Sequence, residues 1–157
     1  MFTQAEANAL VASLRLAQAW LDPAMAGDAE AALGKIFSVL SVSSRAAAES
    51  LPLYAPVMGV DVATQGKLQL LREAAQARRK LRVDYVDAAG KNSQRVLWPL
   101  GCFYWGSVWT LAAWCEARQD FRGFRVDRMV QLELLDAPMG REPGRTLADF
   151  LRAARKN

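Results

Sequence analysis

The chain has 157 residues, a formal net charge of +4 and no histidine. Histidine is the usual general base near neutral pH and the commonest metal ligand, so catalytic triads built on it and histidine-ligated zinc sites are excluded. We therefore expect no enzyme, no metal and no cofactor; an enzyme that uses Asp84, Asp87 or Asp127 is a distant alternative.

No apolar run approaches the roughly 20 residues that span a bilayer, and the first residues lack the pattern of a signal peptide. We expect a cytoplasmic protein that does not contact membranes.

Residues 1–50 are predicted to be helical. Thr3 and Glu6 have the spacing of a capping box, which marks the start of a helix. Asp22 then has the position of an N-cap and Pro23 that of the first residue of a second helix, which runs to about residue 40. Residues 43–50 can add a short third helix. This helical hairpin is too small to bury its apolar face alone, so we expect residues 1–62 to form a linker and dimerisation region.

The pattern of apolar residues changes after residue 77. A proline-marked linker at residues 51–56 precedes a predicted helix over residues 64–77. Short strands follow over residues 81–85, 93–104, 108–115, 121–128 and 130–135. The second of these bends at residues 99–101, because proline cannot donate to a ladder and glycine permits the bend. Near the end, Thr146 and Asp149 form a second capping box that opens a short amphipathic helix.

This order of elements predicts an α+β protein. The expected architecture is an N-terminal helical hairpin, then a helix and a small five-stranded Sm/SH3-like β-barrel, and finally a short C-terminal helix. The expected domains are the helical region 1–62, the barrel domain 63–137 and a C-terminal tail over residues 138–157.

The charge is distributed unevenly along the chain. Residues 1–61 carry three basic and six acidic groups, a net charge of −3, whereas the remaining residues carry 17 basic and 10 acidic groups, a net charge of +7. A basic barrel attached to an acidic helical region suggests an anionic ligand for the barrel. Ordinary solvated arginine is the alternative that composition alone leaves open.

Several short motifs follow one another between residues 85 and 129. They are, in order, Tyr85-Val86-Asp87, Gly90, Ser93-Gln94-Arg95, Pro99-Leu100-Gly101, the run from Trp109 to Cys115, and the run from Asp120 to Met129. In this order and spacing the segment resembles a WYL domain, and the helical start and the tail resemble regulators of the short, YafY-like type. The family is named after a Trp-Tyr-Leu triplet. The triplet here is Trp109-Thr110-Leu111, in which Thr110 replaces the tyrosine.

The resemblance implies a ligand-sensing domain of a bacterial transcriptional regulator. In this family the domain usually follows a winged helix-turn-helix that binds duplex DNA, the proteins are typically dimers, and nucleotides or single-stranded nucleic acid are among the proposed ligands. No helix-turn-helix candidate precedes the hairpin in this sequence. We expect a sensor separated from its DNA-binding domain, so that duplex DNA is bound only through that missing domain; a stand-alone sensor is the alternative.

The candidate ligand-binding residues are arginines with polar neighbours. Arginine stays charged and presents a planar fork of donors that grips phosphate. We expect the ligand to be bound by Arg95, Arg122, Arg125 and Arg128, with Ser93 and Tyr85 as polar accessories.

The spacing of the three arginines after residue 120 raises a geometric question. A regular strand places Arg122 and Arg128 on one face and Arg125 on the other, unless a bulge or irregular turn occurs near Gly123. Phe121 and Phe124 can offer stacking surfaces for bases, or they can belong to the core while the arginines pair with nearby acids.

The functional hypothesis is a two-state sensor. An anionic ligand engages the arginines and shifts the barrel relative to the hairpin, which requires different affinities for the two arrangements. The alternatives are a stand-alone nucleic-acid-binding module of Sm-like fold and a purely structural dimerisation domain. In all of these, Trp109 and Leu111 are expected in the core, and the ring of Tyr85 is expected to be buried with its hydroxyl on a polar partner.

Overall fold

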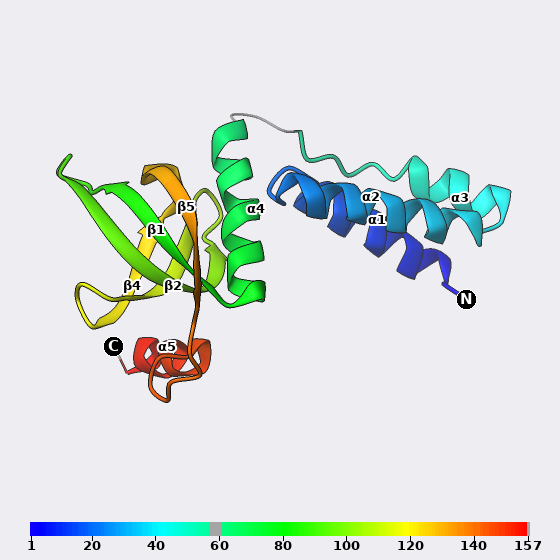
Figure 1. Ribbon diagram of the computed structural model, residues 1–157. Coiled ribbons are helices and arrows are strands. Elements are labelled where there is room, and N and C mark those ends of the chain that lie inside the picture. The colour runs from blue at the N-terminus through cyan, green and yellow to red at the C-terminus, as the bar shows by residue number, and fades with distance from the viewer. Residues whose placement is uncertain (57–60, 157) are drawn as a thin grey trace. The chain divides into compact units, whose positions relative to one another are not determined.

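A computed structural model describes residues 1–56 and 61–156 of the chain. The chain divides into two compact units, residues 1–66 and residues 67–157, and helix α4 (Val62–Ala77) crosses the boundary (Figure 1). Each unit is described by itself below. No helix in the described part of the chain is long and apolar enough to cross a membrane.

The first unit contains the predicted helices α1 (Gln4–Gln18), α2 (Pro23–Ser38) and α3 (Val42–Glu49). The capping box at the start of α1 is present, because the Thr3 hydroxyl accepts from the Glu6 amide at 3.1 Å and the Glu6 carboxylate accepts from the Thr3 amide at 3.1 Å. Asp22 caps α2 by accepting from the Met25 amide at 3.0 Å. These helix starts were predictable because caps are local hydrogen bonds between residues three apart.

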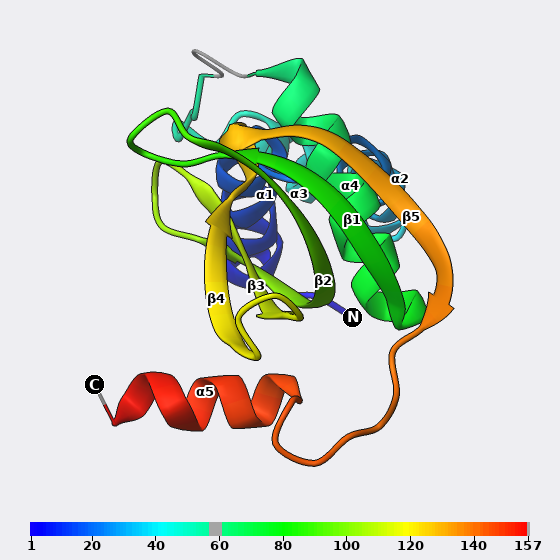
Figure 2. The same cartoon turned by 60° about the vertical axis from the view of Figure 1, so that its left-hand side comes forward.

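The second unit is a curved antiparallel sheet with helices packed on it (Figure 2). Its elements after α4 are β1 (Arg79–Val86), β2 (Asn92–Tyr104), β3 (Trp109–Cys115), β4 (Asp120–Arg125), the 3-10 turn η1 (Val126–Arg128), β5 (Met129–Pro138) and α5 (Leu147–Arg155). The α+β class and the order of helices and strands agree with the sequence prediction. The bend in β2 is also confirmed, since the register with β3 shifts between Pro99 and Gly101.

The sheet is not the closed barrel that the sequence predicted. The strand order is β4-β3-β2-β1-β5, so β4 and β5 form the two edges, and the described residues contain no ladder between them. The strand predicted to reach Arg128 ends at Arg125, where the backbone turns through η1. Side-chain contacts link β4 to β1 instead: the Arg125 amide donates to the Tyr85 hydroxyl at 3.0 Å, and the Tyr85 ring packs edge-on against Phe124.

The core lies on the inner face of this sheet. Leu81, Val83, Leu97 and Leu111 are fully buried there, and Leu71 of α4 packs into the same cluster. Strand residues that alternate with these point to the outer face, as the two-residue period of a strand requires.

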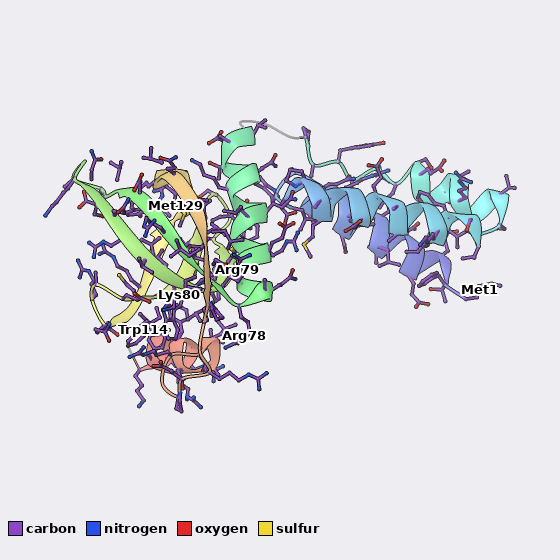
Figure 3. All side chains as sticks on the ribbon, viewed as in Figure 1. Met1, Arg78, Arg79, Lys80, Trp114 and Met129 are labelled. Carbon is purple, nitrogen blue, oxygen red and sulfur yellow. The ribbon has the colours of Figure 1, made fainter. Side chains whose placement is uncertain are left out.

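Helix α5 packs on aromatic residues of the outer face. The Phe150 ring lies 5.8 Å from the ring of Phe103 in β2 and 5.8 Å from the ring of Phe121 in β4. Phe121 in turn packs edge-on against Trp114 at 5.2 Å, at the end of the sheet nearest α5 (Figure 3). The tail predicted as a short amphipathic helix is therefore part of the packed unit.

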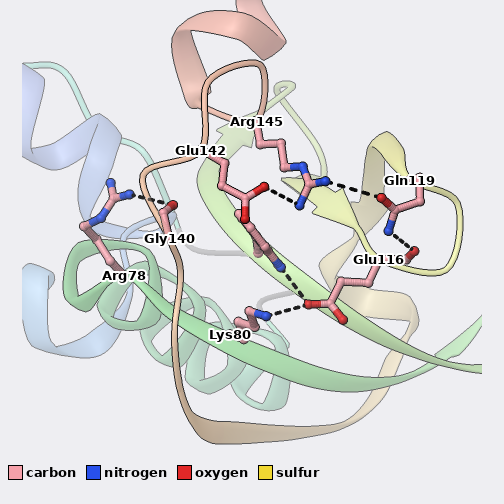
Figure 4. Close-up of polar contacts among 8 residues, drawn as sticks. Arg78, Lys80, Glu116, Gln119, Gly140, Glu142 and Arg145 are labelled. Carbon is pink, nitrogen blue, oxygen red and sulfur yellow. Dashed lines mark hydrogen bonds and ion pairs between the residues drawn. The ribbon is translucent and has the colours of Figure 1, made fainter.

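A second set of contacts holds the segment before α5 (Figure 4). The Arg145 guanidinium lies over the rings of Trp98, at 5.1 Å, and Trp114, at 4.8 Å. Beneath it, Glu116 accepts from the Lys80 ammonium at 2.8 Å and from the Trp98 indole N–H at 2.8 Å. The hydrogen bonds from Lys80 and then from Trp98 lower the pKa of Glu116, so this cluster keeps its ion pair at neutral pH.

Removing the Tyr85 hydroxyl should weaken the attachment of β4 to β1. In Tyr85→Phe the Arg125 amide loses its acceptor, and we expect the free energy of unfolding to fall by about 1 kcal/mol in urea titrations. Tyr54→Phe is the control, since that ring is 72% exposed and its hydroxyl lies outside this unit. Equal midpoints for Tyr85→Phe and the wild type would contradict the assigned role.

Helix α5 should lose stability in acid. Hydrogen bonds from the Thr146 hydroxyl and amide, and then from Arg152, lower the pKa of Asp149 from 3.8 to about 2. Because the folded-state pKa is the lower one, this stabilisation is present above about pH 4 and is lost as the pH falls through about 2. Carboxyl carbon NMR should show the low titration midpoint, and Thr146→Ala should raise it more than Arg152→Gln does. An ordinary Asp149 midpoint in the wild type would show that the capping box does not form.

Candidate functional site

A pocket of about 610 Å³ lies at the free edge of β4. We call it the edge pocket. Its basic lining consists of Arg122 and Arg125 of β4 and Arg128 of η1, and its aromatic lining consists of Tyr85, Phe103, Trp105 and Phe150. The pocket extends around Gly123, whose exposed position on the edge strand leaves the backbone accessible from both faces of the sheet.

Arg122 has an unusual environment within the edge pocket. Its partner in the β3–β4 ladder is the buried Ala113, and its guanidinium lies 5.4 Å from the ring centroid of the core residue Phe124. The Nη1 atom is buried and makes no hydrogen bond within the part of the chain that the structure describes. A buried polar nitrogen without an acceptor is unfavourable and uncommon, because its lost hydration is not replaced.

Arg125 and Arg128 differ in their pairing. Arg125 binds Asp127 through two hydrogen bonds, at 3.0 Å and 2.7 Å, which raise the pKa of Arg125 and lower the pKa of Asp127. Its positive charge is therefore largely balanced. Arg128 is half-buried, and within residues 1–56 and 61–156 its side chain forms no hydrogen bond or ion pair.

The three arginines line one pocket although they are spaced three residues apart. The β3–β4 register is regular from Asp120 to Arg125, so no bulge occurs at Gly123. Arg122 lies on the inner side and Arg125 on the outer side of β4, and the 3-10 turn that follows carries Arg128 back to the same edge. They converge because the pocket surrounds a strand edge and does not lie on one face.

Tyr85 and Thr110 also line the edge pocket. The Tyr85 ring is 6% exposed and packs edge-on against Phe124 at 5.1 Å, while its hydroxyl accepts from the Arg125 amide. A buried ring with a satisfied hydroxyl is the arrangement that the sequence predicted. Thr110 lies on the outer face of β3, opposite Arg125 in the ladder.

Arg95 and Ser93 are not in the edge pocket. The β1–β2 register places them opposite Val83 and Tyr85, in β2, which lies two strands from β4. There the Arg95 Nε donates to the Ser93 hydroxyl at 3.3 Å, and its Nη1 lies 4.0 Å from the Cys115 sulfur. The sequence could not show that Arg95 and Ser93 lie apart from the other three arginines, because that distance depends on the order of strands in the sheet.

The aromatic residues near the edge pocket are not those that the sequence singled out. Phe124 is fully buried and Phe121 packs between other rings, so neither presents a free face for stacking. Trp109 packs against the core and Leu111 is buried in it. Sequence reasoning missed Phe103, Trp105 and Phe150; the signal available for Trp105 was a large aromatic residue placed in a predicted turn.

The described part of the chain contains no group of three or more His, Cys, Asp or Glu side chains that could hold a metal ion. The chemistry that the edge pocket offers is instead a set of guanidinium donors beside aromatic rings, which suits a planar or phosphate-bearing anion.

Comparisons with known proteins agree with this geometry. Residues 66–134, which run from α4 into β5, match the family model described as WYL domain. No curated protein matches the chain. Among solved structures, Proteasome accessory factor B/C (PafBC) of Arthrobacter aurescens is similar in fold, with a TM-score of 0.50 and 21% sequence identity over 89% of this chain. The chain spans 21% of the length of that protein. Residues 66–134 are therefore similar to a WYL domain, and the chain shares its fold with part of that solved structure.

Proposed function

We propose that this protein is the effector-sensing and dimerising part of a bacterial transcriptional regulator, and that it binds an anionic ligand, a nucleotide or single-stranded nucleic acid, in the edge pocket. The observation that carries the proposal is the buried Nη1 of Arg122, which has no hydrogen-bond partner among the described residues. The role is one of binding and not of catalysis.

An anionic oxygen would relieve the unfavourable state of Arg122. Hydrogen bonds between guanidinium and phosphate are charge-assisted and roughly twice as strong as neutral ones. Arg128, whose side chain forms no hydrogen bond or ion pair within the described residues, supplies a second charge at the same pocket. The guanidinium of Arg125 is already bound to Asp127. The volume of about 610 Å³ lies within the usual range for small-molecule sites, about 300–1,000 Å³.

The position of the edge pocket also suggests how binding is transmitted. Tyr85 and Arg125 line the pocket and form the hydrogen bond between β1 and the β4 edge. A ligand that binds more tightly when this link is in one of two arrangements will shift the balance between them. We propose that this shift is the signal passed to the rest of the regulator.

The helical unit supports the proposal of a homodimer. Helix α2 has no buried residue, and large apolar side chains are exposed nearby, including Leu16 at 62% and Val39 at 58%. Burial of such side chains against a second copy is the usual way to remove them from water.

Arg122→Gln should weaken ligand binding at the edge pocket. We expect a loss of roughly tenfold or more in affinity for a fluorescently labelled single-stranded hexamer of thymidine, measured by anisotropy, because a charge-assisted hydrogen bond is removed. Arg118→Gln is the matched control, since it removes the same charge from an exposed position outside the pocket. Arg95→Gln should also leave the affinity unchanged.

The salt dependence separates this proposal from its alternatives. Two arginine contacts to phosphate, from Arg122 and Arg128, predict a slope of about −1.4 in a plot of log affinity against log salt. A much steeper slope, unaffected by Arg122→Gln, would indicate an extended nucleic-acid-binding surface. If the folded protein binds no anionic probe, the sensing function is refuted and a purely structural dimerisation domain is the remaining alternative.

Leu16→Glu should dissociate the proposed homodimer, because it places a charge in a contact that excludes water. Light scattering should give twice the chain mass for the wild type and the single-chain mass for the variant. Gln18→Glu, which adds the same group at an exposed polar position of α1, should remain dimeric. A wild-type protein that is monomeric at micromolar concentrations would refute the dimer.

A further inference from the structure

Trp105 is a large aromatic side chain that is held in place while exposed to solvent. It follows β2 directly and is 66% exposed, yet it lines the edge pocket. Its amide donates to the Val108 carbonyl at 2.9 Å, which closes the turn between β2 and β3. Its indole N–H donates to the Thr110 hydroxyl at 2.8 Å. These hydrogen bonds fix both the backbone and the side chain of Trp105, although the ring is mostly exposed.

Thr110 is the residue that departs from the Trp-Tyr-Leu triplet. At this position on the outer face of β3, the threonine hydroxyl provides the acceptor that orients Trp105. The Trp105 ring also lies nearly parallel to that of Phe103, with an interplanar angle of 23° and a centroid distance of 6.3 Å. Thr110 and Phe103 thus set the plane of the exposed indole.

We infer that Trp105 is the stacking surface of the edge pocket, and that the ligand carries a planar nucleobase next to its phosphate. The inference rests on the proposed function and names the residue that receives the base of such a ligand, because a fixed and exposed indole lies in the same pocket as the arginines. Thr110 acts as a positioning residue through its hydrogen bond to the indole. Free nucleotides and single strands share this chemistry.

The chemistry of the two lining groups is complementary for such a ligand. Arg122 and Arg128 supply charge for the phosphate, and the indole face supplies the large polarisable surface on which a base stacks. Preorganisation matters here, because a ring that is already fixed loses little conformational freedom when the base binds. The rings of Phe121 and Phe124 cannot serve this purpose, since other side chains cover them.

The test compares two probes of equal charge on the full chain. One is the labelled thymidine hexamer and the other is an abasic hexamer with the same phosphates. We expect the wild type to bind the thymidine hexamer roughly tenfold more tightly. Trp105→Ala should abolish this preference and leave the affinity for the abasic hexamer unchanged. Arg122→Gln should weaken both probes by a similar factor.

Variants at Thr110 test the positioning role. Thr110→Val keeps the shape but removes the acceptor, and should reduce the preference for the base-bearing probe, whereas Thr110→Ser should restore it. The fluorescence emission of Trp105 is obtained by subtracting the spectrum of Trp105→Phe from that of the wild type. The thymidine hexamer should quench this emission, whereas the abasic hexamer should not. Trp20→Phe, at a tryptophan outside the pocket, should leave the quenching intact.

The outcomes separate the two levels of the proposal. If the wild type binds both hexamers with equal affinity and Arg122→Gln weakens the binding of both, the stacking role of Trp105 is overturned. The proposal that the edge pocket senses an anion then still holds. A base preference that survives Trp105→Ala would also overturn it. If thymidine monophosphate is preferred over deoxyribose 5-phosphate, the source is a free nucleotide; if only the hexamer shows the preference, it is a strand. Failure of every probe would overturn both proposals.

Discussion

In the second unit, a hydrogen bond from the Arg125 amide to the Tyr85 hydroxyl holds the edge of an open sheet. An edge strand presents backbone groups that no ladder satisfies, and β4 is such a strand. Tyr85 is suited to the contact because its ring is anchored in the core against Phe124 while its hydroxyl reaches the edge. The hydrogen bond and the ring contact join β4 to β1 without a ladder between the two strands, and the edge pocket lies beside them.

Arginine has two different roles in this unit. Arg145 lies over Trp98 and Trp114 and holds the segment before α5, so it is structural. The Arg122 guanidinium lies near the ring of the core residue Phe124, and its buried Nη1 has no acceptor among the described residues. Charge counting along the sequence treats these residues alike. Their partners distinguish an arginine that stabilises the fold from one that is available to a ligand.

The C-terminal helix connects the outer face of the sheet to the edge pocket. Phe150 of α5 covers Phe103 and Phe121 and also lines the pocket beside the arginines. The residues 138–157 were expected to be a separate tail, yet one of their side chains forms a wall of the candidate site. This helix contains no fully buried residue, and its Phe150 ring packs against rings of β2 and β4.

The sequence by itself determined the features that arise from neighbours along the chain. The caps at Thr3, Asp22 and Thr146, the strand alternation and the bend near Pro99 all follow from hydrogen bonds or periods within a few residues, and each is present. Tertiary structure decided the open edge, the absence of Arg95 from the edge pocket and the position of Trp105 in it. These features depend on the order of the strands and on the turn after Arg125, which bring together residues that are far apart in the sequence. A local sequence pattern does not specify such long-range contacts.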